Sequence, residues 1–296
     1  MSLNAGILYG LGAYLAWGLL PIYWKTIHGV SATELIAHRV VWSFLSLVAI
    51  IGLSRQWRRF RAAVADRRVL GIYVIAAALI TVNWFVYVWG VNSGFIVETS
   101  LGYFINPLVS VVFGVAVFGE RLRRLQWTAV ALAAGGVVYL TIAYGALPWI
   151  ALALALSFGS YGLVKKMAPL SSMYGLTLET AMVLVPAAAY LLVHERWGGG
   201  TFLHHGYISD ALLVGTGAVT TVPLLLFASA VRRTPLSTMG VLQYIAPTLQ
   251  LLLGVLVYGE PFTRTQFTGF AIVWAGLIVF GLDGLLSRRA PVPALA

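Results

Sequence analysis

The chain has 296 residues, of which 60% are hydrophobic and only 9% are charged, and its formal net charge is +10. A soluble domain carries about 25% charged residues, so this composition excludes an ordinary soluble protein. The absence of cysteine also excludes disulfides, thiolate metal sites and cysteine nucleophiles. Apolar stretches recur along the whole chain, and each is long enough to cross a hydrocarbon core about 30 Å thick as a helix. The sequence therefore predicts an all-α, polytopic membrane protein.

Ten membrane-spanning helices follow one another along this sequence. In chain order we place them at residues 5–25, 33–53, 70–92, 97–118, 125–143, 146–164, 173–193, 208–230, 236–257 and 264–286. The first apolar run is too long for the core of a signal peptide and lacks a basic segment before it, so it is interpreted as the first span. The connections are short, which leaves no room for a sizeable soluble domain.

The basic residues indicate the direction of these helices, because Lys and Arg accumulate in cytoplasmic loops. Fifteen of the nineteen basic residues fall on one side of a ten-span arrangement: in the loops after spans two, four, six and eight, and in the C-terminal tail. Removing one span would reverse every later loop and destroy this agreement. We therefore expect ten spans, with both termini in the cytoplasm.

The second half of the sequence repeats the first at an offset of 140 residues. Pro107 aligns with Pro247, and the pair Gly119-Glu120 aligns with Gly259-Glu260. Each half holds five spans, and an odd number forces the second copy to insert upside down. Inverted repeats are a common plan of secondary transporters, whose substrate site lies between the halves near the midplane. A duplicated bundle with a purely structural role is the alternative.

Pro107 and Pro247 lie inside spans four and nine. A proline removes one helical hydrogen bond and kinks the helix, and unpaired backbone within a membrane is tolerated only against protein or a water-filled cavity. Tyr103 shares a helical face with Pro107, and Gln243 and Gln250 share a face with Pro247. We expect these two stripes to line a passage, and the two prolines to serve helix bending and gating.

Several motifs carry a resemblance to a known family: "AYLAWGLLPIYWK" (13–25), "ELIAHRVVWS" (34–43), "ETSLGYFINPL" (98–108) and "QYIAPTLQ" (243–250). The chain resembles the RarD-type branch of the EamA-domain transporters in the drug/metabolite transporter superfamily. This resemblance implies two five-helix repeats around a central cavity, at residues 1–144 and 145–286, followed by a cytoplasmic tail at 287–296. It also implies export of small organic solutes, commonly amino acids and other metabolites, across the bacterial inner membrane.

Polar groups present in only one half are the candidates for recognising a solute. Asn83 aligns with a proline and Asn106 with an alanine, so the fold does not require either amide. The alternative role is helix-to-helix hydrogen bonding, worth about 0.6 kcal/mol per contact in membranes. Aromatic rings could stack on an amphipathic solute. The predicted substrate-binding residues are Trp17, Asn83, Tyr87, Tyr103, Asn106, Tyr161, Gln243 and Gln250.

Ionisable groups inside a membrane are costly and tend to mark pathways or relays. Glu34 and His38 stand four residues apart at the start of span two, followed by Arg39. They could bind the charged end of a substrate or exchange a proton, or they could form an ion pair at the outer interface. Glu98 begins span four, and Glu179 is the acid within span seven. We predict Glu34, His38, Glu98 and Glu179 as possible charge or proton relays.

The sequence carries no motif of an enzyme. It lacks the P-loop pattern, the HExxH zinc motif and the GxSxG nucleophile elbow, so we expect no catalytic residues, no cofactor and no metal. We expect a transporter that works by alternating access without ATP. Its partners would be a small-molecule substrate and the lipid bilayer, with no nucleic acid, and a monomer would suffice. A multidrug or antibiotic efflux permease and a channel-like uniporter are the alternatives.

Overall fold

The computed structural model describes residues 5–27, 29–93, 95–145, 148–204, 206–259 and 263–289. These residues form helices and short connections, with no strand among them, and ten stretches are long and apolar enough to cross a membrane. Nine of these ten stretches are single helices. The remaining one, which comes ninth along the chain, is interrupted. The spans are α1 (Ala5–Trp24), α2 (Ala32–Leu53), α4 (Arg67–Asn92), α5 (Ile96–Phe118), α6 (Arg124–Tyr144), α7 (Trp149–Met167), α8 (Ser172–Arg196), α9 (Tyr207–Val231), α10 (Leu236–Gln243) with α11 (Ile245–Leu252) and the π-helical turn η1 (Leu253–Val257), and α12 (Arg264–Arg289).

Local chemistry explains why several helices begin and end where they do. The hydroxyl of Ser31 accepts a hydrogen bond from the Glu34 amide at the start of α2, and Ser171 caps α8 in the same way. Such caps satisfy amides that have no partner within the helix. Gly119 and Gly145 end α5 and α6 with φ angles of 63° and 79°, a left-handed conformation that glycine adopts without steric cost.

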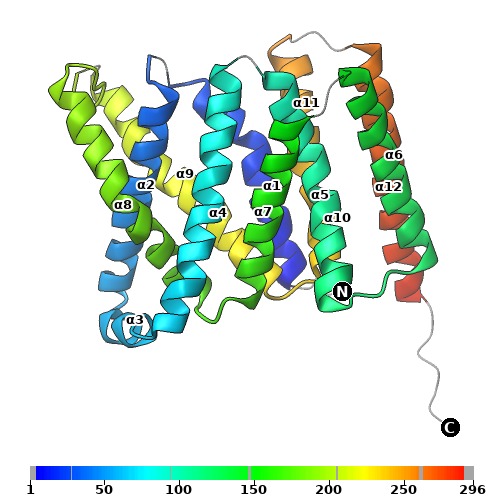
Figure 1. Ribbon diagram of the computed structural model, residues 1–296, viewed down its shortest axis with the longest axis horizontal. Coiled ribbons are helices and arrows are strands. Elements are labelled where there is room, and N and C mark those ends of the chain that lie inside the picture. Colours follow the sequence, from blue (N-terminus) through cyan, green and yellow to red (C-terminus); the bar gives the residue numbers. More distant parts are fainter. Residues whose placement is uncertain are drawn as a thin grey trace.

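The bundle keeps its pattern of neighbours when its two halves are exchanged (Figure 1). Three helices pack on their own counterparts: α6 on α12, α2 on α8 and α5 on α10. The other contacts come in matched sets. α1 packs on α11 and α9, and its counterpart α7 packs on α5 and α4, which are the counterparts of those two helices. A duplicated five-helix unit would produce this arrangement, and the upside-down relation of the copies stays a prediction.

The start of α1, the end of α12 and the short helix α3 (Trp57–Ala63) lie at one edge of the bundle (Figure 1). The connections at 119–123, 168–171 and 232–235 reach the same edge. Because most of the arginines of the connections lie here, we call it the basic edge. The described ends of the chain therefore lie on one side, as the ten-span arrangement requires.

The two equivalent prolines have different surroundings. α5 runs through Pro107 as one helix, whereas the ninth span breaks between α10 and α11 at Tyr244. The break follows Gln243, whose carbonyl would accept the hydrogen bond that Pro247 has no N–H to donate. The sequence predicts that the two prolines act alike, but the helix is interrupted before Pro247 and continuous through Pro107.

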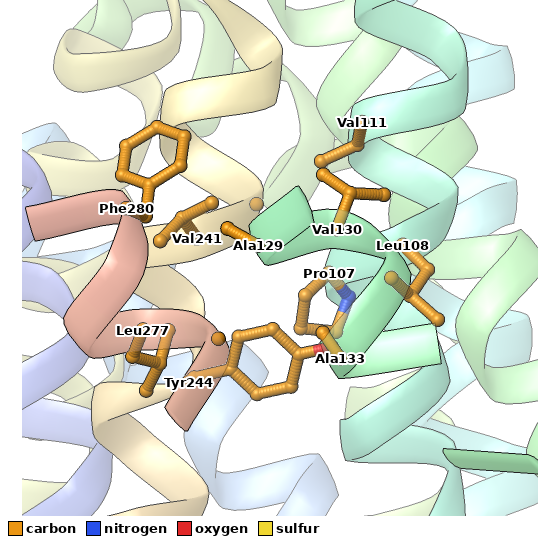
Figure 2. Close-up of a pocket in the computed structure, with 12 residues that line it drawn as sticks. Pro107, Leu108, Val111, Ala129, Val130, Ala133, Val241, Tyr244, Leu277 and Phe280 are labelled. Atoms are coloured by element: carbon orange, nitrogen blue, oxygen red, sulfur yellow. The ribbon is translucent and has the colours of Figure 1, made fainter. Parts of the chain in front are cut away.

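Pro107 also lines a small apolar hollow between α5, α6, α10 and α12 (Figure 2). This hollow measures about 10 Å³, which is room for one water at most. Val111, Val130 and Leu277 surround it (Figure 2). The closest approach on this side is at Gly240, where an added Cβ would lie 2.5 Å from the Pro107 carbonyl oxygen. Pro107 is therefore packed between helices.

Candidate substrate cavity

A cavity of about 190 Å³ lies between the two halves of the chain. A water molecule needs about 10–15 Å³ on this measure, so the space holds many waters or a small organic molecule. Four helices of each half contribute to its wall. The lining residues are Tyr14, Trp17, Leu20, Pro21, Trp24, Arg39, Ile80, Asn83, Trp84, Tyr87, Thr99, Gly102, Tyr103, Asn106, Leu154, Phe158, Val219, Thr220, Leu224, Gln243, Ala246, Pro247 and Gln250.

The cavity extends from the middle of the bundle to the side away from the basic edge. Most of its lining residues on α1, α2, α4, α5 and α7 lie in the helix halves opposite the basic edge, whereas those on α9 and α10 lie near the middle of their spans. The half at the basic edge is filled by packed side chains, among them Tyr73, Tyr161, Leu236 and Met239, all at most 1% exposed. The cavity is therefore closed toward one side of the bundle.

Arg39 supplies a positive charge to the cavity wall. Its Nε donates a hydrogen bond to the Thr220 hydroxyl over 3.0 Å. Its guanidinium carbon lies 5.2 Å from the ring centre of Trp24 and 4.8 Å from that of Trp84, within the range of cation–π attraction. Nothing in the sequence separates Arg39 from its neighbours Glu34 and His38, and it is not among the predicted substrate-binding residues.

Three of the predicted amides contact the wall in different ways. The Asn83 Nδ2 donates hydrogen bonds to the Leu154 carbonyl and the Ser157 hydroxyl, at 2.9 and 3.0 Å, and so ties α4 to α7. The Gln250 Nε2 donates to the Trp17 carbonyl at 3.1 Å. Asn106 is 4% exposed, and its Oδ1 has no hydrogen-bond partner among the described residues. A buried amide oxygen without a partner is unfavourable, so the Oδ1 of Asn106 is available to accept a hydrogen bond from a solute.

Aromatic rings cover much of the remaining surface. The ring of Trp17 packs against Tyr14, Phe158 and Phe227, with centroid distances of 5.6–5.8 Å. Tyr87 and Tyr103 meet edge to face at 5.9 Å. Such rings offer flat apolar surfaces, and the tyrosine hydroxyls add polar tips. The wall therefore suits a molecule with both apolar and polar parts.

The structure brings most of the predicted substrate-binding residues together at this cavity. Trp17, Asn83, Tyr87, Tyr103, Asn106, Gln243 and Gln250 line it, and so does Pro247. Tyr161 lies outside its wall. The Tyr161 side chain is fully buried toward the basic edge, where its hydroxyl donates a hydrogen bond to Glu179 Oε2 at 3.0 Å.

Glu34 and His38 lie outside the cavity wall as well. Glu34 Oε1 accepts hydrogen bonds from the amide and the hydroxyl of Thr201, both at 2.8 Å, and thereby attaches the α8–α9 connection to α2. The Nε2 atoms of His194 and His38 approach the same carboxylate at 3.7 and 3.9 Å. This cluster holds a loop at the edge opposite the basic one. The side chain of Glu98, the third predicted relay, lies outside the described residues.

Glu179 forms a buried ion pair with Lys165 at the basic edge. Their Nζ and Oε1 atoms lie 2.6 Å apart, and both side chains are 3% exposed. The Lys165 Nζ also lies 5.4 Å from the ring centre of Tyr73. The pair joins α7 to α8 between the cavity and the basic edge. Relay roles for these carboxylates stay predictions. Among the described residues, no group of three or more His, Asp or Glu is placed to hold a metal ion.

A carboxylate in the α5–α6 connection joins the two halves at the basic edge. Glu120 accepts hydrogen bonds from the amides of Leu236 and Ser237, at 2.6 and 2.9 Å, and from the Ser237 hydroxyl at 2.6 Å. Lys166 Nζ lies 3.6 Å from it. Burial opposes ionisation, but these hydrogen bonds and Lys166 outweigh burial, so the pKa of Glu120 lies below its ordinary value. Glu120 thus caps the N-terminus of α10.

Comparisons with known proteins agree with this architecture. The model of the EamA-like transporter family matches residues 4–142 and again residues 147–282. "Protein RarD" of Streptomyces exfoliatus is 46% identical over 290 residues, covering 97% of this chain and 91% of that protein. "Protein RarD" of Escherichia coli K12 is 41% identical over 284 residues, covering 96% of each. "Uncharacterized transporter" of Vibrio cholerae is 44% identical, covering 96% and 94%.

A solved crystal structure shares the fold. It superposes with a TM-score of 0.69 at 23% identity and covers 98% of this chain and 100% of the other. The chain has ten helical stretches suited to cross a membrane, a cavity between its two halves, and a family match to each half. The chain is a multi-pass membrane protein that belongs to the EamA-like transporter family.

Proposed function

We propose that this protein is a secondary transporter that moves small organic solutes through the central cavity by alternating access, without ATP hydrolysis. The observation that carries the proposal is the cavity itself: its wall comes from both halves, it begins near the middle of the bundle, and side chains are packed between it and the basic edge. A cavity between two repeats that is closed toward one side is what alternating access requires of one of its states.

The direction follows from the charge distribution. If the basic edge faces the cytoplasm, both termini are cytoplasmic and the cavity lies on the outer side of the bacterial inner membrane. The Glu120 cap and the Lys165–Glu179 ion pair then close the cytoplasmic side. We propose an exporter of metabolites such as amino acids, because the cavity combines aromatic, amide and hydroxyl groups. A single chain encloses the cavity, so a monomer suffices.

The proposal is tested with purified protein reconstituted into lipid vesicles. A panel of amino acids and related metabolites is loaded inside, and efflux is followed with and without a competing solute. Transport predicts flux that saturates and that competitors inhibit. Flux that rises linearly with concentration indicates a pore, and the absence of flux for the whole panel refutes the proposal.

A pair of matched variants links the flux to the cavity. Ala246 lines the cavity and Ala116 lies exposed on the outside of α5. Ala246→Leu adds side-chain volume to the wall, so we expect it to lower the saturable flux, whereas Ala116→Leu should leave it unchanged. Equal flux through both variants would show that solutes do not pass through this cavity.

A further inference from the structure

We infer that the cavity binds its solute through a carboxylate, with Arg39 as the counter-ion, and that it therefore selects organic acids with one negative charge over neutral or cationic molecules of the same shape. This inference rests on the proposed function, because it concerns the same cavity. It adds the chemical class of the solute and names the residue that would choose it.

The described wall of the cavity holds no counter-charge for Arg39. Arg39 lines the cavity, and every acidic side chain that the structure describes pairs with another group: Glu34 with Thr201, Glu179 with Lys165, Asp283 with Arg123, and the remaining ones likewise. A guanidinium removed from bulk water is unfavourable unless an anion compensates it. Of the lining residues that the structure describes, Arg39 alone is charged, so a bound anion would supply what this wall lacks.

The contacts around the guanidinium of Arg39 fix its position. Its Nε is occupied by the Thr220 hydroxyl, and the indoles of Trp24 and Trp84 lie within 5.2 Å of its carbon. These contacts position the planar group on the wall. The two terminal nitrogens have no hydrogen-bond acceptor among the described residues. A planar fork of N–H donors is the group that binds a carboxylate through two parallel hydrogen bonds.

The rest of the cavity wall combines aromatic and neutral polar surface. Beyond Arg39 the described part of the lining is neutral, with Trp17 and Tyr87 providing aromatic surface and the unpaired Oδ1 of Asn106 providing a hydrogen-bond acceptor. A single cation is matched by a single negative charge, so a polyanion would bring charges without partners. An inorganic anion would leave the aromatic wall without a matching surface. One carboxylate on an apolar or aromatic body fits the whole wall.

The test compares three probes of one shape: 3-phenylpropanoate, its neutral amide, and the cationic 3-phenylpropylamine. Binding to the purified protein is followed by the quenching of tryptophan fluorescence, at constant chloride. A charge-assisted hydrogen-bond pair predicts that the carboxylate binds about 10- to 150-fold more tightly than the amide. In Arg39→Gln this ratio should fall to about 3-fold or less, and in Arg39→Lys, which keeps the charge but loses the planar fork, it should be intermediate.

The ratio is measured within each protein, so a partly misfolded variant does not imitate the expected result. A wild-type ratio near one, a ratio that Arg39→Gln retains, or competition by chloride or phosphate as strong as that by the carboxylate would overturn the inference. Saturable vesicle flux of the amide equal to that of the carboxylate would also overturn it and leave the proposed transport standing. The absence of saturable flux for all solutes would refute both.

Discussion

Glu120 gives the sharpest prediction about stability. Its carboxylate accepts three hydrogen bonds at the start of α10, and the side chain is 13% exposed. Glu120→Gln keeps the shape but removes the charge and turns one acceptor into a donor that faces other donors. A hydrogen bond to a charged group is worth roughly 1 kcal/mol more than a neutral one. Over three bonds, the variant should lose about 2–3 kcal/mol.

The assay is the apparent melting temperature of the detergent-solubilised protein. For a chain of this size the loss corresponds to a decrease of about 3–5 °C. Glu195→Gln is the matched control, because that carboxylate is 51% exposed and its contact is a single pair with His204. An exposed pair contributes about 1 kcal/mol at most. If both variants melt at the same temperature, the Glu120 cap does not stabilise the contact between the halves.

The pH dependence of the wild type provides a second arm of this test. The pKa of Glu120 is lowered in the folded protein, so its contribution is fully present above the ordinary glutamate value of about 4.5 and is lost as the pH falls through the lowered pKa. The difference in melting temperature between the wild type and Glu120→Gln should therefore shrink below that pH. A difference that stays constant into acid would contradict the role of the charge.

Three further variants test the packing and the cavity, each by melting temperature. Lys165→Met leaves the buried carboxylate of Glu179 without a counter-ion and should cost about 3–5 kcal/mol, and the double variant with Glu179→Leu should recover most of this loss. Gly217→Ala should destabilise the α2–α9 contact strongly, because an added Cβ would lie 2.6 Å from the backbone of α2, whereas Gly71→Ala, in open space, should not. Asn106→Leu should raise the melting temperature, since it removes an unpaired buried amide worth about 1–3 kcal/mol, and yet lower the affinity for solutes.

The ten spans were predictable from the sequence because length and apolarity decide them. The boundaries agree to within a few residues, and capping by Ser31 and Gly119 adds a local signal. The helix at Trp57–Ala63 was not predicted. It has seven residues and rests on a tertiary contact, in which the ring of Phe60 packs against Tyr174 at 5.5 Å. Periodicity within so short a segment cannot reveal such a contact.

The wall of the cavity was predictable where the repeat of the sequence pointed to it. Amides present in one half alone marked Asn83 and Asn106, and both line the cavity. Arg39 follows His38 directly, but one residue turns a helix by about 100°, so His38 points toward the α8–α9 connection while Arg39 lines the cavity. The sequence does not show which neighbours surround each face of a helix, and Tyr161 was misplaced for the same reason.

The contrast between the two equivalent prolines has a consequence for motion. One motif, repeated at an offset of 140 residues, exists here as an unbroken helix around Pro107 and as two shorter helices before Pro247. The two copies of this segment thus adopt two different backbone conformations within a single molecule. If the proposed carrier reverses its direction by exchanging these conformations between its halves, its second state uses backbone conformations that the first already displays.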